Sequence, residues 1–184
     1  MVSIVDLDHL DPEHHTSAAR ILHEAFRDHW PGAWPTLADA RDEVAEALSA
    51  DRIALAALEQ QQVLGWIGAQ PSHGYSAWEL HPLVVAETQR ARGIGRLLVR
   101  ALEERLAQRS AVTLWLGTDD ETELTSLAGR DLYPDVLTEL ATLENRGEHP
   151  FTFYQRLGFS VVGVIPDANG PGKPDILMAK RIRT

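Results

Sequence analysis

The chain has 184 residues, of which 44% are hydrophobic, so it can bury a sizeable core and is expected to form a single domain over residues 1–184. It contains no cysteine, which excludes disulfide frameworks and thiolate metal sites. A formal net charge of −10 argues against nucleic acid binding, which depends on neutralising phosphates, and favours cationic small molecules as partners.

The first quarter of the chain predicts one strand and two helices. The strand is expected over residues 2–7, and apolar residues at helical spacing predict a helix over residues 13–28. A loop rich in tryptophan and proline follows at residues 30–35. Thr36 is then placed to cap a second helix, which runs to about Leu48.

Three apolar runs come next and predict an antiparallel meander. They cover residues 52–58, 63–69 and 78–85, and a polar turn of Glu59 and three glutamines joins the first two. A helix is expected from Ile94 to Leu106, followed by a strand over residues 111–116.

The last third of the chain begins with a polar, helix-prone segment, residues 119–147, which is more typical of an insertion than of a core element. A short helix is expected over residues 150–156, with Gly158 as its stop. Strands over residues 159–165 and 175–180 flank a loop rich in glycine and proline. The whole pattern predicts one mixed α/β domain.

The joint between the strand at 78–85 and the following helix carries the clearest chemical signal. Its turn and first helical residues are Gln89, Arg90, Ala91, Arg92, Gly93, Ile94, Gly95 and Arg96. Backbone N–H groups and the positive end of the helix dipole converge at such a joint, which suits a phosphate or pyrophosphate. The two glycines let the backbone approach an anion, and the arginines add positive charge.

Other phosphate motifs fit this joint poorly. A Walker loop needs a lysine after its last glycine, and the only lysines are Lys173 and Lys180. A dinucleotide fingerprint needs a third glycine where this chain has Leu98. A plain glycine turn with solvated arginines is the structural alternative, and the spacing Arg90-x-x-Gly93-x-Gly95 favours the phosphate site over it.

This signature resembles the acetyl-CoA pyrophosphate loop of the GCN5-related N-acetyltransferases. Within that superfamily the chain is similar to the aminoglycoside 6′-N-acetyltransferases over its whole length, most densely from Trp78 onward. The segments that carry the similarity occur in order: WELHPLVV at residues 78–85, LGTDD at 116–120, HPFTFY at 149–154, and VGVIPDANG at 162–170 with KPDI at 173–176.

The resemblance implies an α/β fold with a mixed, strongly twisted sheet, flanked by helices, whose fourth and fifth strands splay apart. Acetyl-CoA, the cosubstrate, is expected to enter there, with its pantetheine arm pairing with the backbone of Leu83, Val84 and Val85. Its pyrophosphate is expected on the loop of Arg90, Ala91, Arg92, Gly93, Ile94, Gly95 and Arg96. A proline at position 82 is tolerable if the strand edge there faces a cofactor or a bulge.

The implied reaction needs a base, an oxyanion donor and an acid. Glu79 and His81 alternate onto the same side of their strand, so Glu79 is the candidate base and ammonium anchor, and His81 the residue that orients it or relays the proton. The backbone N–H of Leu83 is expected to polarise the thioester carbonyl, and Tyr154 to protonate the leaving thiolate. The structural alternatives are a solvated strand face for Glu79, a satisfied and partly buried histidine for His81, and a core position for Tyr154.

Substrate recognition is expected from acidic residues and one tryptophan. Asp119, Asp120 and Glu121 follow a strand and, together with Glu79, predict an anionic mouth for a substrate with several ammonium groups. The spacing Thr118-x-x-Glu121 also fits a capping box that opens a helix, and both functions can coexist. Trp30 is a candidate cover for the sugar rings, with a loop anchor as the alternative.

The implied activity is acetylation of the 6′-amino group of aminoglycoside antibiotics, and so antibiotic resistance. An acetyltransferase for another amine, such as a polyamine or a protein N-terminus, and a non-catalytic acetyl-CoA-binding module are the alternatives. No metal is expected, because the histidines lack ligand spacing. The family resemblance suggests a homodimer. The sequence has no signal-like start and no run near the roughly 18 apolar residues of a membrane span, so a cytoplasmic protein without a membrane partner is expected.

Overall fold

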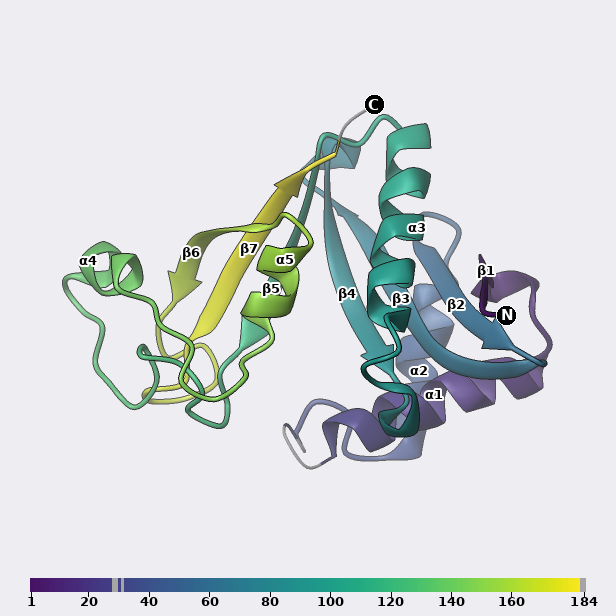
Figure 1. Cartoon of the computed structure of the whole chain (residues 1–184), viewed down its shortest axis with the longest axis horizontal. Coiled ribbons are helices and arrows are strands. Elements are labelled where there is room, and N and C mark those ends of the chain that lie inside the picture. Colours follow the sequence, from purple (N-terminus) through teal and green to yellow (C-terminus); the bar gives the residue numbers. More distant parts are fainter. Residues whose placement is uncertain (28–29, 31, 183–184) are drawn as a thin grey trace. The chain divides into compact units, whose positions relative to one another are not determined.

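The computed structural model describes residues 1–27, 30 and 32–182, so the expected helix end at Asp28 lies outside the described residues. The chain divides into two compact units. The first comprises Met1–Leu114 and takes in Ile182, and the second is Trp115–Arg181. Both units combine antiparallel strands with helices, so the expected mixed α/β class is confirmed (Figure 1). That these units act as one domain stays a prediction.

The first unit is built on the antiparallel meander that the three apolar runs predict. Its strands are β1 (Ser3–Asp6), β2 (Ile53–Glu59), β3 (Gln62–Ser72) and β4 (Ala77–Val85). They pair in that order, each antiparallel to the next. The β2–β3 turn is tight because Gln60 and Gln61 adopt φ values of 50° and 65°, as a two-residue hairpin turn requires.

Helices cover both faces of this meander: α1 (Pro12–Phe26) and α2 (Leu37–Ala47) lie behind it in Figure 1, and α3 (Ile94–Gln108) lies in front. Trp66 of β3 is fully buried, and its indole N–H donates to the carbonyl of Ala18 at 3.1 Å, which ties the sheet to α1. As predicted, Thr36 caps α2, with a capping box to Asp39. Each described helix is too short or too polar to cross a membrane.

A β-bulge interrupts the ladder between β3 and β4. The register shifts between Ile67 and Ala69, so that His81 and Pro82 of β4 together face Gly68 of β3. A side chain at position 68 has no room, because a Cβ there would lie 2.4 Å from the carbonyl oxygen of His81. The expectation that a bulge makes Pro82 tolerable is therefore confirmed.

The second unit contains the remaining predicted strands and a short helix. β5 (Thr113–Asp119) leads into it from the first unit, and β7 (Asp175–Arg181) lies between β5 and β6 (Ser160–Ile165). α5 (Phe151–Arg156) precedes β6 and contacts both β6 and β7. Gly158 adopts a φ of 89° just after this helix, so the predicted glycine stop is confirmed.

The segment between β5 and α5 differs from the expectation of a helix-prone insertion. Its described residues form turns and one short helix, α4 (Val136–Ala141), and Leu127 is fully buried. The carboxylate of Asp120 explains this fold, because its two oxygens accept the backbone N–H groups of Leu124 and Thr125 at 2.7 and 2.8 Å. A buried carboxylate thus takes the place of a helical ladder, and the segment contributes to the core of its unit.

Candidate active site

The predicted site residues fall into two groups, one in each unit. The first unit holds the residues of β4, the glycine loop that leads into α3, and Trp30. The second unit holds Asp119, Asp120 and Tyr154. The joint action of the two groups stays a prediction, and each group has its own geometry.

Glu79 and His81 lie on the less buried side of β4, as the alternation predicts. Side chains of β4 alternate between buried and half-buried, with Trp78 and Leu80 in the core. The amide N–H of Gln70, opposite Glu79 on β3, donates to Glu79 Oε2 at 2.9 Å. Glu79 is therefore a held carboxylate and not a freely solvated one.

His81 is accessible and has two neighbours from other elements. Its side chain is 41% exposed, and its Nε2 lies 3.8 Å from Oε1 of Glu43 on α2. The indole ring of Trp34 lies 5.7 Å from the imidazole ring, centroid to centroid, at an interplanar angle of 40°. His81 is thus outside the core, and its half-buried position with two neighbours also fits the structural alternative of a satisfied, partly buried histidine.

The backbone of β4 offers polar groups on the side opposite β3. The carbonyl oxygen of Val84 points at Gly65 of β3, where a Cβ would meet it at 2.5 Å, and the N–H of Ala86 donates to Leu64. Polar groups of successive strand residues point to opposite sides, so those of Leu83 and Val85 point away from β3. The Leu83 N–H is therefore outside this ladder, while the side chain of Val84 is buried in the core.

The glycine loop forms an open N-terminus for α3. Gly93 is its N-cap residue at a φ of 80°, and Ala91 also adopts a positive φ, 61°. Within the described part of the chain, no side chain caps this helix, so the N–H groups of its first turn lack the intrahelical acceptors that later residues have. A Cβ built on Gly93 meets no atom within 4 Å, so space is open beside these donors. This loop fits a pyrophosphate.

The three loop arginines are exposed but differ in their partners. Arg92 donates to Glu59 Oε2 at 2.9 Å and also to Gln89. The bond from Arg92 lowers the pKa of the Glu59 carboxyl. Part of the charge of Arg92 therefore serves to hold the loop against the β2–β3 turn, whereas Arg90 and Arg96 are exposed along the loop and the first turn of α3.

Tyr154 lies on α5 in an aromatic environment. Its ring meets those of Phe153 and Phe159 edge-on, at centroid distances of 5.1 and 5.6 Å. Burial raises the pKa of the Tyr154 hydroxyl, because the phenolate would lose its hydration. The side chain is thus kept in the protonated form, which is the form that an acid catalyst needs.

The acidic residues at the end of β5 and just after it, Asp119, Asp120 and Glu121, do not act as one exposed group. Asp120 is buried and its carboxylate is occupied by backbone N–H groups, so its predicted place in an anionic mouth is wrong. Glu121 pairs with Lys173 at 2.7 Å. Asp119 accepts a hydrogen bond from the amide of Asn169, and burial raises the pKa of its carboxyl. The capping box expected from Thr118 is also wrong, because a turn and no helix follows it.

His149 and Asn145 connect the end of β5 to the start of α5. His149 is buried, its Nδ1 accepts the N–H of Phe151 at 3.2 Å, and its Nε2 lies 3.0 Å from the carbonyl oxygen of Asp119. A carbonyl only accepts, so the ring proton is on Nε2, and burial lowers the pKa of this imidazole. Asn145 Oδ1 accepts the N–H of His149, and its amide donates to the His149 carbonyl, both at 2.9 Å. The sequence places His149 in a motif without indicating this role.

Sequence reasoning also missed Trp34, Glu43 and Gln70. Trp30, the predicted cover of the sugar rings, is half-buried, but the tryptophan of this loop that contacts His81 is Trp34. The sequence could have indicated Glu43, because it is a charged residue next to Val44, which lies on the apolar face of α2. Gln70 could have been found only from the register of β3 and β4, which places it opposite Glu79.

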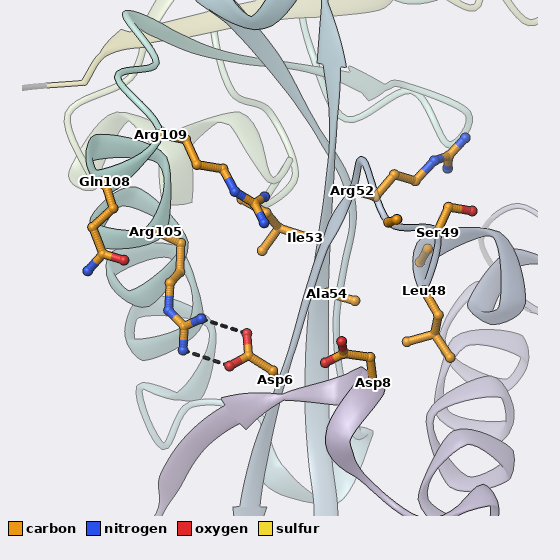
Figure 2. A pocket seen from close by; sticks show the side chains of 12 residues that line it. Asp6, Asp8, Leu48, Ser49, Arg52, Ile53, Ala54, Arg105, Gln108 and Arg109 are labelled. Atoms are coloured by element: carbon orange, nitrogen blue, oxygen red, sulfur yellow. Dashed lines mark hydrogen bonds and ion pairs between the residues drawn. The ribbon is translucent and has the colours of Figure 1, made fainter.

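A pocket of about 200 Å³ lies elsewhere in the first unit, lined by the C-terminal end of α3, β1, and the link from α2 to β2 (Figure 2). Its charged side chains already have partners: Arg105 forms two bonds with Asp6 at 2.7 and 2.8 Å, and Arg109 lies over the ring of Trp78. It sits at the opposite end of α3 from Gly93, and none of the predicted site residues lines it. The described residues also contain no group of three side chains able to hold a metal ion.

Comparison with known proteins identifies the family of the chain. The model of the acetyltransferase (GNAT) family matches residues 19–133. An aminoglycoside 6′-N-acetyltransferase complexed with coenzyme A is 39% identical, with a TM-score of 0.90, over 99% of this chain and 98% of that one. The aminoglycoside 6′-N-acetyltransferase from Enterococcus faecium is also 39% identical, with a TM-score of 0.88 and the same coverage.

An aminoglycoside 6′-acetyltransferase type Ii is 35% identical over 99% of this chain and 98% of that one, with a TM-score of 0.74. No curated protein has a significant sequence match to the chain. The family model covers more than half of the chain, and the similar structures match nearly all of it. The chain therefore belongs to the GNAT family of acetyltransferases, whose acetyl donor is acetyl-CoA.

Proposed function

We propose that the chain transfers the acetyl group of acetyl-CoA to the 6′-amino group of aminoglycoside antibiotics. The observation that carries this proposal is the similarity, at 35–39% identity and over nearly the whole chain, to three structures named as aminoglycoside 6′-acetyltransferases. The half-buried Glu79 and Glu43 near the accessible His81 support a cationic substrate, because carboxylates there attract an ammonium group.

The first unit supplies the groups that hold the acetyl donor. The N–H groups of the first turn of α3 and the exposed Arg90 and Arg96 bind the pyrophosphate. Leu83 and Val85 present backbone groups on the side of β4 away from β3, where an extended pantetheine arm pairs as an added strand does. The N–H of Leu83 then polarises the thioester carbonyl and stabilises the oxyanion that forms there.

The amine is a cation at neutral pH and must lose a proton before it attacks. Glu79 accepts that proton, directly or through water, while Gln70 holds its other oxygen and His81 orients the amine or relays the proton. The free amine then forms the N–C bond, and the C–S bond breaks with its electron pair on sulfur. Tyr154 donates the proton that converts the thiolate into a thiol, and its phenolate then recovers a proton from solvent, which burial favours because it raises the Tyr154 pKa.

Further ammonium groups of the substrate are held by Asp119, the last residue of β5. Its carboxylate is half-buried, so an approaching ammonium group replaces part of the hydration that burial removes. Each such partly solvated pair contributes about 0.2–1 kcal/mol. Trp30 remains the proposed cover for the sugar rings.

A thiol-release assay with acetyl-CoA tests the proposal. The panel contains kanamycin-type aminoglycosides, linear polyamines and a peptide with a free N-terminus, and NMR assigns the acetylated position. We expect turnover with the aminoglycosides and acetylation at the 6′-amino group, together with a raised minimal inhibitory concentration when the gene is expressed in a susceptible bacterium. Turnover confined to polyamines or peptides contradicts the substrate, and cofactor binding without turnover on any amine contradicts the enzymatic role.

A further inference from the structure

We propose that Glu43 is a positioning residue that fixes the imidazole of His81 for the acetyl transfer proposed above, on which this inference rests. Glu43 lies on α2, outside both strand β4 and the glycine loop. Its carboxylate links His81 to a buried tryptophan, and through it to α1. The imidazole of His81 is thereby held from a second element besides its own strand.

The carboxylate of Glu43 is shared between two partners. Its Oε2 accepts the indole N–H of Trp34 at 3.3 Å, and its Oε1 lies 3.8 Å from Nε2 of His81. The Glu43 side chain is only 15% exposed, whereas the imidazole is 41% exposed, so water reaches this pair from the side of His81 and not from that of Glu43. A separation of 3.8 Å exceeds a direct hydrogen bond, but catalytic contacts of this kind often tighten only when substrate is bound.

Trp34 is itself fixed, which makes it a support for Glu43. It is buried in the core cluster of the first unit, and its ring meets that of Phe26 edge-on at a centroid distance of 4.9 Å. The Trp34 carbonyl accepts the Nδ1–H of His23 on α1 at 2.9 Å. A chain of contacts therefore runs from α1 through Trp34 and Glu43 to His81.

The orientation has a chemical consequence. A carboxylate accepts hydrogen bonds, so Glu43 favours the imidazole tautomer that carries its proton on Nε2. Nδ1 of His81 is then left with its lone pair, able to accept from the substrate ammonium or from a water between that ammonium and Glu79. Without Glu43 the ring is free to rotate and to exchange tautomers, and a smaller fraction of the bound complexes has the acceptor in place.

The chain offers a matched control for Glu43 on the same helix. Glu46 lies one turn further along α2, is exposed, and pairs with Arg52 and not with His81. Glu43→Gln and Glu46→Gln therefore make the same chemical change at neighbouring helical positions, and only the first alters the partner of His81. Trp34→Phe provides a further variant, because it removes the N–H that holds Glu43 and keeps an aromatic ring.

We expect Glu43→Gln to lower kcat roughly tenfold, a part of the 10²–10⁴-fold that a positioned acid–base group contributes, with KM for acetyl-CoA unchanged. Glu46→Gln should keep wild-type kcat, and Trp34→Phe should fall between the two. In a His81→Asn background, Glu43→Gln should have almost no further effect, because the residue through which it acts is gone. Thermal unfolding of each variant identifies any that fail to fold.

Nitrogen NMR of the imidazole gives a readout that does not depend on turnover. The His81 ring signals should change in Glu43→Gln and stay unchanged in Glu46→Gln. The positioning role is overturned if the two glutamine variants have equal kcat, or if Glu43→Gln lowers kcat as much in the His81→Asn background as in the wild type. If no amine is acetylated, the proposed function fails, and unchanged His81 signals in Glu43→Gln then overturn this inference separately.

Discussion

The close contact between Gly68 and the bulge of β4 makes Gly68→Ala a sharp test of how the catalytic strand is held. A Cβ on Gly68 would lie 2.4 Å from the carbonyl oxygen of His81 and 3.4 Å from Cδ of Pro82. A carbonyl oxygen of a paired strand cannot turn away as a flexible side chain can. The two strands must therefore separate locally, and the residue that moves first is His81.

The size of the effect follows from overpacking. Forcing a methyl group into a filled position typically destabilises a protein by about 1–3 kcal/mol. For a chain of 184 residues, each kcal/mol lowers Tm by about 2–4 °C, so a decrease of about 2–12 °C is expected. Turnover should also fall, because a displacement of about 1 Å in a catalytic group can reduce the rate 10²-fold.

Thermal unfolding followed by circular dichroism measures the first effect, and the thiol-release assay measures the second at a temperature where the variant is folded. Gly163→Ala is the matched control, since Gly163 also lies within a strand and a Cβ there makes only ordinary contacts, the nearest at 3.5 Å. If Gly68→Ala and Gly163→Ala have the same Tm and the same kcat, the bulge does not hold His81 in place.

Four further outcomes are expected. Gly93→Val should weaken acetyl-CoA binding in calorimetry, because the added side chain occupies the open space beside the N–H groups of the first turn of α3; the positive φ of Gly93 strains a valine there and should also lower Tm, and unchanged affinity contradicts the pyrophosphate site. Tyr154→Phe should lower kcat by about 10²-fold with donor affinity intact, whereas wild-type turnover would leave Tyr154 a core residue. The Asp119→Asn variant should raise KM for an aminoglycoside and flatten the dependence of this KM on salt concentration. Asp120→Asn should instead lower Tm, because the Asp120 carboxylate accepts two backbone N–H groups. A change of KM in Asp120→Asn and not in Asp119→Asn would reverse this assignment. Burial holds the pKa of His149 below 6.5 in the folded state, so as pH falls below about 6.5 the unfolded chain binds a proton that the native state does not. The free energy of unfolding should therefore decrease by at most about 1.4 kcal/mol per pH unit. His149→Gln should remove this dependence on pH in urea titrations between pH 6.5 and 5, and an unchanged dependence would exclude His149 as its source.

Local patterns predict most of the elements of this chain. The apolar periodicity of α3 and the alternation along β4 survive in the structure because each of these segments buries one face against its neighbours. Thr36 and Gly158 act at short range, through a cap and a left-handed turn, and such signals are readable from adjacent residues alone.

The errors arise where burial and the packing of elements, and not the local sequence pattern, decide what a side chain bonds. In the sequence Asp120 resembles an exposed acidic residue, but it is buried and its carboxylate accepts two backbone N–H groups, so its role is structural. The pairing of Gln70 with Glu79 depends on strand register, and that of Glu43 with His81 on how α2 packs on the sheet. No local pattern encodes these distances, so the motif indicates the reactive residues but not the ones that hold them.

The segment between β5 and α5 is stabilised by a few side chains that bond backbone groups, above all Asp120, Asn145 and His149, in place of a continuous ladder. Its tolerance to amino-acid change must therefore be very uneven. A saturation library should lose function sharply at these three positions, while exposed sites such as Leu137, 79% accessible, accept most replacements. Directed evolution toward new substrates can randomise the accessible residues of this segment densely, provided that the three bonded positions are left unchanged.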